Sequence, residues 1–153
     1  MNLVKNDIIK LNITSATAEG SGVGKTEDGI AVFVPLSAVG DELEVRILKT
    51  KKTYAFGKIE NIITPSSARI EADCPQFSKC GGCTWRHISY EEELKIKSMR
   101  VYDAVTRIGG IKDFDFKDII GCANPDRYRN KAQFPIGKDK DGKAIFGFYS
   151  FHT

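Results

Sequence analysis

Apolar and polar positions alternate along the first part of the chain in the manner of short β-strands. The pattern is carried by the runs DIIKLNITSA (7–16), GIAVFVP (29–35), DELEVRILK (41–49) and TYAFGKIENIIT (53–64). Turn signals separate these runs at Gly20 to Gly24, Asp28-Gly29 and Gly40-Asp41. Five short strands within about sixty residues, with no helix long enough to cover a sheet, predict a small closed barrel of the OB type.

The glycine-rich stretch GSGVGKT (20–26) is similar to a phosphate-binding P-loop. That motif requires a glycine five positions before Gly24, where this chain has Glu19. No helix is predicted to begin at Lys25, so the phosphate would also lack a helix N-terminus. We therefore expect a glycine-rich turn of the barrel.

A second region follows the polar stretch TPSSAR (64–69), which is typical of a linker. The spacing predicts a helix over about 89–108, because Ser89 and Glu92 form an S-x-x-E capping box and Gly109-Gly110 ends the pattern. Favourable i,i+4 pairs join Glu91 to Lys95 and Glu93 to Lys97. One face of this helix carries Leu94, Val101, Val105 and Ile108.

The pattern returns to β near the end of the chain. NKAQFPIG and KAIFGFYSF flank KDKDG, whose Asp141-Gly142 predicts a β-hairpin over about 128–150. A hairpin alone is not a stable sheet, so we expect an incomplete domain. The expected fold is mainly β with one helix: an OB-like barrel over 1–66, and part of an α+β domain over 67–153.

Composition and charge narrow the function classes. The chain has 153 residues, 41% of them hydrophobic, and a net charge of +3, which permits binding to a polyanion. The N-terminus lacks the apolar core of a signal peptide, and no stretch approaches the roughly eighteen apolar residues of a membrane helix. We expect a cytoplasmic protein with no membrane partner, and we infer no obligate protein partner.

Three of the four cysteines, Cys74, Cys80 and Cys83, lie within ten positions. The C-G-G-C spacing lets two thiolates converge on one metal ion or on two corners of a cluster. Zinc is a serious alternative to an iron-sulfur cluster on spacing alone, and a redox pair of Cys80 and Cys83 is a weaker one. Cys122 is either a distant fourth ligand or a small buried residue.

Two groups of basic and aromatic residues suggest contact with RNA. Lys49, Lys51 and Lys52 lie near Tyr54 and Phe56, a combination that can track phosphates and stack bases. A second group contains Arg127, Tyr128, Arg129 and Lys131. The alternative is that both groups are solvated cations beside core aromatics. Their pairing beside a barrel favours RNA.

Several motifs occur along the chain in an order that is similar to that of a known protein family. The chain carries AEGSGVGK in the barrel, then C-x5-C-G-G-C followed by TW and H, a capped helix, NPDRYRNKAQFPIG, and GFY. This order resembles the TRAM-containing uracil-5-methyltransferases of tRNA and ribosomal RNA. The resemblance runs from about Asp7 to the last residue and implies the N-terminal part of such an enzyme.

The resemblance implies RNA binding by the barrel and a [4Fe-4S] cluster held by Cys74, Cys80 and Cys83. It places the fourth ligand beyond Thr153 and assigns no ligation to Cys122. It also implies a further domain, absent from this chain, that binds S-adenosylmethionine and carries the catalytic cysteine and carboxylate. We therefore expect no catalytic residue in this chain and no activity of it alone. The alternative function is a stand-alone zinc-stabilised RNA-binding module that uses all four cysteines.

Overall fold

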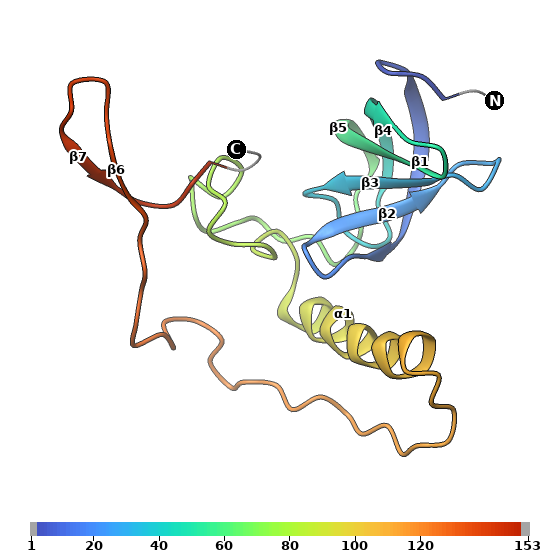
Figure 1. The fold of residues 1–153 in the computed structure, drawn as a ribbon. Helices are drawn as coiled ribbons and strands as arrows, with labels where there is room; N and C mark the ends of the chain where they lie inside the picture. Colours follow the sequence, from blue (N-terminus) through green and yellow to red (C-terminus); the bar gives the residue numbers. More distant parts are fainter. Residues whose placement is uncertain (1–2, 151–153) are drawn as a thin grey trace.

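The computed structural model describes residues 3–150, and the expected ends of the two domains lie outside that range (Figure 1). Five strands close into a barrel in the order β1-β2-β3-β5-β4, which confirms the predicted architecture. All pairings are antiparallel except that of β3 with β5. The strands are β1 (Ile8–Ala16), β2 (Ser21–Lys25), β3 (Ala31–Pro35), β4 (Glu42–Thr50) and β5 (Tyr54–Thr64).

The interior of the barrel is the main hydrophobic core of the described chain. Buried and half-buried positions alternate along β3 and the first six residues of β4, as the sequence pattern predicts. The core residues are Leu11, Ile13, Val32, Val34, Leu43, Val45, Ile47 and Ala55.

The strand β2 corrects the prediction of a turn over Gly20 to Gly24. The turn is confined to Thr17–Gly20, and the glycines that follow it are part of a strand. Gly22 and Gly24 are buried and point into the barrel. A Cβ on Gly22 would meet the side chains of Ser37 and Ile13. The strand carries glycine at these inward positions because β1 and the loop after β3 leave no room for a side chain.

The helix α1 (Tyr90–Asp103) continues as a π-helical segment over Ala104–Ile108 and ends at Gly109, so the predicted range is confirmed. Ser89 caps it by accepting a hydrogen bond from the N–H of Glu92 at 3.3 Å. Lys97 pairs with Glu93 as predicted. Lys95 pairs with Glu92 in place of Glu91. No residue of α1 is buried, and its apolar side chains lie largely in solvent.

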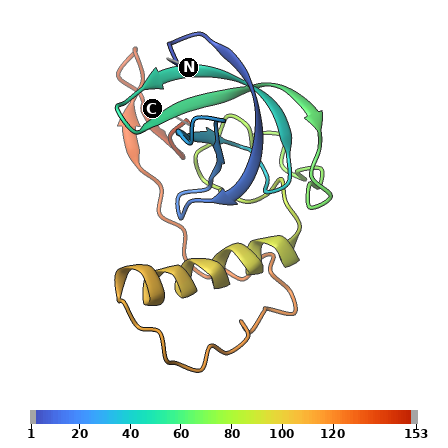
Figure 2. The same ribbon diagram turned by 90° about the vertical axis from the view of Figure 1, so that its right-hand side faces the viewer.

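The predicted hairpin is present but shorter than expected. Its strands are β6 (Ile136–Lys138) and β7 (Ala144–Phe146), three residues each. Gly142 adopts a left-handed φ of 78° in the turn, as the Asp-Gly signal predicts. Figures 1 and 2 show an extended segment that runs from the end of α1 to the hairpin. Within the described residues, no helix is long and apolar enough to cross a membrane.

Candidate nucleic-acid interface and cysteine segment

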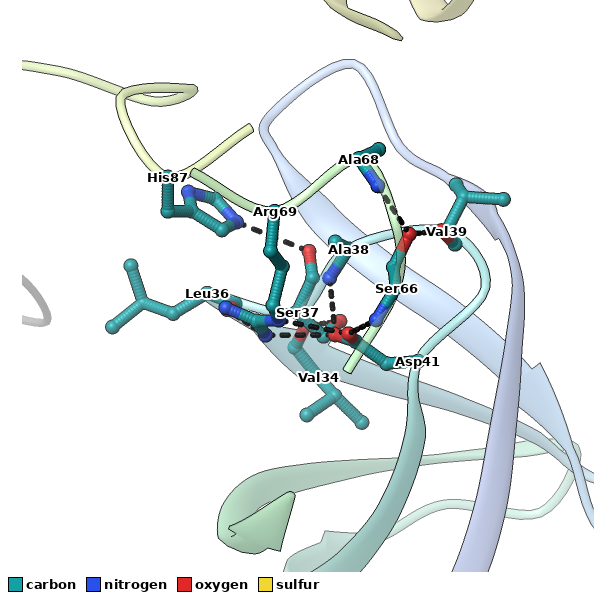
Figure 3. Close-up of polar contacts among 10 residues, drawn as sticks. All are labelled: Val34, Leu36, Ser37, Ala38, Val39, Asp41, Ser66, Ala68, Arg69 and His87. Carbon is teal, nitrogen blue, oxygen red and sulfur yellow. Dashed lines mark hydrogen bonds and ion pairs between the residues drawn. The ribbon is translucent and has the colours of Figure 1, made fainter. Parts of the chain in front are cut away.

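A buried ion pair joins the barrel to the chain that leads to the cysteines (Figure 3). Asp41, which is 1% exposed, lies in the loop between β3 and β4. Arg69 donates to its carboxylate through Nε and Nη2, at 2.7 Å each. The backbone N–H groups of Ala38 and Ser66 also donate to it, at 2.6 and 2.9 Å. These four hydrogen bonds satisfy a charge that would otherwise be costly to bury.

The sequence predicts a linker over residues 64–69, and the structure anchors this stretch to the barrel instead. The hydroxyl of Ser66 donates to the carbonyl of Val39 at 2.6 Å. The guanidinium of Arg69 also donates to the carbonyl of Leu36, at 3.0 Å. The cysteine segment that follows therefore begins from a fixed point on the barrel.

His87 forms a second connection between the barrel and the cysteine segment. Its Nε2 donates to the carbonyl of Ser37 at 3.2 Å, because a carbonyl can only accept. Its ring stacks on Phe77, with ring centroids 5.3 Å apart. Phe77 belongs to the loop between Cys74 and Cys80, so this stacking connects the cysteine loop to the barrel through His87. The Nδ1 atom of His87 is buried and has no hydrogen-bond partner within residues 3–150.

The two buried ionisable groups, Asp41 and His87, differ in their ionisation at neutral pH. Burial alone raises the pKa of Asp41, but the hydrogen bonds from Arg69, Ala38 and Ser66 outweigh it and hold that pKa below 3.8. Burial lowers the pKa of His87 below 6.5 and outweighs both its hydrogen bond to Ser37 and the nearby charge of Asp41. The carboxylate is therefore ionised and the imidazole neutral.

The three clustered cysteines lie in one loop as free thiols. Cys74 and Cys83 are exposed, and Cys80 is half-buried and accepts a hydrogen bond from the N–H of Gly82 at 3.4 Å. Thiols of this kind, with a backbone donor nearby, fit the chemistry of a thiolate-bound metal. However, the part of the chain that the structure describes contains no group of three Cys, His, Asp or Glu side chains that could hold a metal ion. The arrangement therefore does not bring the three thiols into one site.

The end of the described chain returns to this loop. The N–H of Gly81 donates to the carbonyl of Tyr149 at 2.9 Å. Cys80 and Ser150 pair as an isolated antiparallel bridge. The last described residues of the chain therefore lie beside Cys80.

Cys122 lies in an exposed loop. Its thiol donates to the carbonyl of Asn124 at 3.1 Å, and its N–H donates to the hydroxyl of Tyr90 at 2.8 Å. The interpretation of Cys122 as a small buried core residue is therefore wrong.

The first basic group lies at one end of the barrel. Lys49 is in the last part of β4, and Lys51 and Lys52 are in the turn between β4 and β5. All three are exposed, and none forms an ion pair within residues 3–150. Tyr54, half-buried, begins β5. Phe56 follows on the same strand, so the five residues that the sequence groups here lie at the end of β4, in the turn and at the start of β5.

The second basic group lies in the segment between the helix and β6. Tyr128 is 64% exposed, and the guanidinium of Arg129 lies 5.7 Å from the centre of its ring. Arg127 has a left-handed φ of 55°, and Lys131 is exposed.

Arg86 holds this second group against the cysteine segment. It pairs with Asp73 and, at 2.6 Å, with Asp126, and the hydrogen bonds to these carboxylates raise its pKa. A cleft of about 510 Å³ opens beside it. A second cleft of about 460 Å³ lies next to the first, and its lining includes Cys83, Trp85, Arg127, Tyr128 and Arg129.

Sequence reasoning missed the residues that connect the barrel to the cysteine segment, Asp41, Arg69 and His87. Asp41 was visible only as part of a Gly-Asp turn signal, and Arg69 only as the end of a polar stretch. It also missed Phe33, which packs against Tyr54 and Phe56. Only the parallel pairing of β3 with β5 reveals that contact.

Comparison with known proteins first defines the class of the barrel. The TRAM domain model matches residues 5–59, which cover most of β1 to β5. The chain is 47% identical over 146 residues to a Clostridium tetani protein named as an RNA methyltransferase, and this match covers 95% of the chain. Proteins with the same name from Halalkalibacterium halodurans and Listeria monocytogenes are 43% and 42% identical, over 95% and 96% of the chain.

These matches show that the barrel is similar to a TRAM domain and that the chain is similar to part of proteins named as RNA methyltransferases. It spans about a third of the length of the curated relatives that it matches, 31% to 32% in these three. Two solved structures are partly similar to it. A conserved Methanococcus maripaludis protein has a TM-score of 0.37 and 23% identity, covering 40% of this chain and 86% of its own. The tRNA (uracil-54, C5)-methyltransferase of Pyrococcus abyssi, in complex with S-adenosyl-L-homocysteine, has a TM-score of 0.41 and 26% identity, covering 67% and 22%.

Proposed function

We propose that this chain is the RNA-recognising part of an S-adenosylmethionine-dependent RNA uracil-5-methyltransferase that acts on ribosomal RNA or tRNA. The observation that carries the proposal is the 47% identity, over 95% of the chain, to a protein named as an RNA methyltransferase. The ordered motifs that resemble the uracil-5 enzymes support the choice of uridine C5. On this proposal, S-adenosylmethionine and the catalytic residues belong to a domain outside these 153 residues.

The barrel supplies the first RNA contact in this proposal. Lys49, Lys51 and Lys52 present three exposed ammonium groups without carboxylate partners in the described chain, so they are available to phosphates. Neutralising phosphates releases counterions, which makes such binding depend strongly on salt. The second group, Arg127, Tyr128, Arg129 and Lys131, supplies a further contact beside the cysteine segment.

The cysteine segment is proposed as the site of a [4Fe-4S] cluster, with Cys74, Cys80 and Cys83 as three of its ligands. The free thiols and the hydrogen bond from Gly82 to Cys80 support this assignment. The family resemblance implies a fourth ligand beyond Thr153, and the pairing of Cys80 with Ser150 supports it, because the last described residue lies beside the loop. When bound, the cluster would cross-link this loop to the following chain.

Salt-dependent RNA binding by the 153-residue chain tests the RNA-recognition part of the proposal. Fluorescence anisotropy with a labelled RNA hairpin should give binding whose log affinity falls linearly with log salt. The triple variant Lys49→Ala, Lys51→Ala, Lys52→Ala should reduce that slope by about 2. A matched variant, Lys138→Ala, Lys140→Ala, Lys143→Ala, removes the same charge from the hairpin and should change affinity less than twofold. Equal losses in the two triple variants, or no binding by the parent, would contradict the proposal.

A tritium-release assay tests the enzymatic part. Methyl transfer to C5 displaces the C5 hydrogen, so RNA labelled with [5-³H]uridine should release tritium when the corresponding full-length protein and S-adenosylmethionine are present. The 153-residue chain alone should release none. Methylation by the full-length protein without tritium release would exclude C5 as the target while leaving RNA methylation intact.

A further inference from the structure

Three aromatic rings form a cluster on the outer surface of the barrel. Phe33 lies on β3, and Tyr54 and Phe56 lie on β5. Their ring centroids are 5.5 to 5.8 Å apart, with two of the three contacts edge-to-face. Their neighbours in sequence, Val32 and Ala55, are fully buried in the core, so the three rings point away from it. Phe56 is 40% exposed. We call these three residues the aromatic platform.

The register of the sheet places cations at the edges of the aromatic platform. Phe56 is paired with Phe33 on one side and with Lys49 on the other. In the next row, Ala31 is paired with Tyr54 and with Lys25, and the N–H of Lys51 donates to the carbonyl of Tyr54 at 2.8 Å. Residues paired across strands share a face of the sheet. The aromatic platform is therefore bordered by lysines on two sides.

A β-bulge brings Lys49 to this outer face. Leu43, Val45 and Ile47 alternate inward along β4, so strict alternation would point residue 49 inward as well. The register shifts between Ile47 and Lys49, which leaves Leu48 as the extra residue. Lys49 is consequently exposed and sits opposite Phe56.

The position of the aromatic platform matches the binding face of OB-type barrels in general. These barrels bind oligonucleotides through the face of strands 2 and 3 and through the loop between strands 4 and 5. Here Phe33 is on strand 3, and Lys51 and Lys52 are in the loop between strands 4 and 5. Exposed aromatic faces surrounded by cations have the chemistry that stacks bases and holds the phosphates between them.

We propose that Phe33, Tyr54 and Phe56 bind unpaired nucleotides of RNA by stacking on their bases, while Lys25, Lys49 and Lys51 contact the flanking phosphates. The occupant is single-stranded because bases in a duplex are stacked on each other and present only their edges. This inference rests on the proposed function and adds to it the class of RNA that the barrel selects. The positive charges attract both single-stranded and duplex RNA, whereas only unpaired bases can stack on the rings of the aromatic platform.

The test compares two variants of the 153-residue chain on two RNAs by fluorescence anisotropy. The probes are a labelled 12-nucleotide oligouridylate and a 12-base-pair RNA duplex. Phe33→Leu with Phe56→Leu removes two π-faces and keeps apolar volume, so it should weaken oligouridylate binding about tenfold or more. Its salt dependence and its duplex binding should stay as in the parent. Lys49→Ala with Lys51→Ala should weaken both RNAs and lower the salt slope.

The outcomes separate this inference from the proposed function. If the leucine variant keeps its far-UV circular dichroism and thermal midpoint yet binds oligouridylate as tightly as the parent, the stacking role is wrong and RNA binding stands. If the parent binds neither RNA, both fail. A measurement without any variant adds a direct check: photocrosslinking of 5-iodouridine-containing oligouridylate should label Phe33, Tyr54 or Phe56. Labels confined to residues outside the aromatic platform would also overturn the inference.

Discussion

Arg69 donates two hydrogen bonds to the carboxylate of Asp41, and this ion pair fixes the start of the cysteine segment to the TRAM barrel. The side chain of Asp41 is fully buried, and that of Arg69 is 19% exposed. An RNA that contacts both the barrel and the cysteine segment would require the two surfaces to keep one relative position. The ion pair and the hydrogen bond from His87 to the carbonyl of Ser37 provide that position.

Loss of this ion pair should destabilise the chain far more than loss of an exposed one. Arg69→Ala leaves a buried carboxylate with only backbone donors, and we expect the free energy of unfolding to fall by about 3 kcal/mol or more. Arg46→Ala is the matched control, because Arg46 also makes two hydrogen bonds of 2.8 Å, to Glu60, at the surface. It should cost much less, because an exposed ion pair contributes little to stability. Urea unfolding, followed by the fluorescence of the single tryptophan Trp85 and by circular dichroism, measures the free energy of unfolding of both variants. Equal losses in the two variants would contradict the prediction.

The neutral state of His87 predicts a loss of stability in mild acid. Its pKa is lowered in the folded chain, so the unfolded chain binds the proton more tightly. The contribution is therefore complete above pH 6.5 and is lost as the pH falls from 6.5 through the folded pKa. His87→Gln should flatten this part of the curve of unfolding free energy against pH. His152→Gln, measured in parallel, accounts for the second histidine of the chain, and a parent curve already flat between pH 5 and 6.5 would refute the prediction.

Local signals in the sequence were sufficient for some elements. The cap at Ser89 and the stop at Gly109 depend on neighbouring residues, and the helix was predicted within a residue or so at each end. The hairpin turn at Gly142 is local in the same way. Strand β2 could not be found by alternation, because its inward positions are glycines that have no apolar side chain to reveal them.

The contacts between the barrel and the cysteine segment could not be predicted from local sequence signals, because they join residues that are far apart in the chain. Asp41 and Arg69 are 28 positions apart, and His87 and Ser37 are 50 apart. Charged and polar residues in loops are usually solvated, so nothing in their local sequence marks them as buried. The clustered cysteines were visible because their spacing is itself the signal, but spacing does not determine whether their thiols converge.

Substitution of Gly22 tests whether the inward positions of β2 have no room for a side chain. In an unhindered strand, replacing glycine by alanine stabilises by about 0.4–1 kcal/mol through the unfolded chain. A Cβ at Gly22 would instead lie 2.7 Å from Cγ2 of Ile13 and collide with the hydroxyl of Ser37. Gly22→Ala should therefore destabilise the barrel by about 1–3 kcal/mol in urea unfolding. Val23→Ala, at the adjacent outward position, should cost less, and a stabilising effect of Gly22→Ala would disprove the close approach.

The cysteines should separate into two classes when metal binding is measured. We expect the corresponding full-length protein, purified without oxygen, to contain iron and sulfide that are lost in Cys74→Ser, Cys80→Ser or Cys83→Ser. Cys122→Ser should leave the content unchanged, because the thiol of Cys122 donates to the carbonyl of Asn124. Each substitution changes one sulfur to oxygen, so Cys122→Ser is a control of equal size.

Stoichiometric zinc that disappears in Cys122→Ser would instead establish the stand-alone zinc module and exclude the cluster assignment. Iron and sulfide that disappear in Cys122→Ser would identify Cys122 as the fourth ligand, which would require the loop around it to move to the cysteine segment.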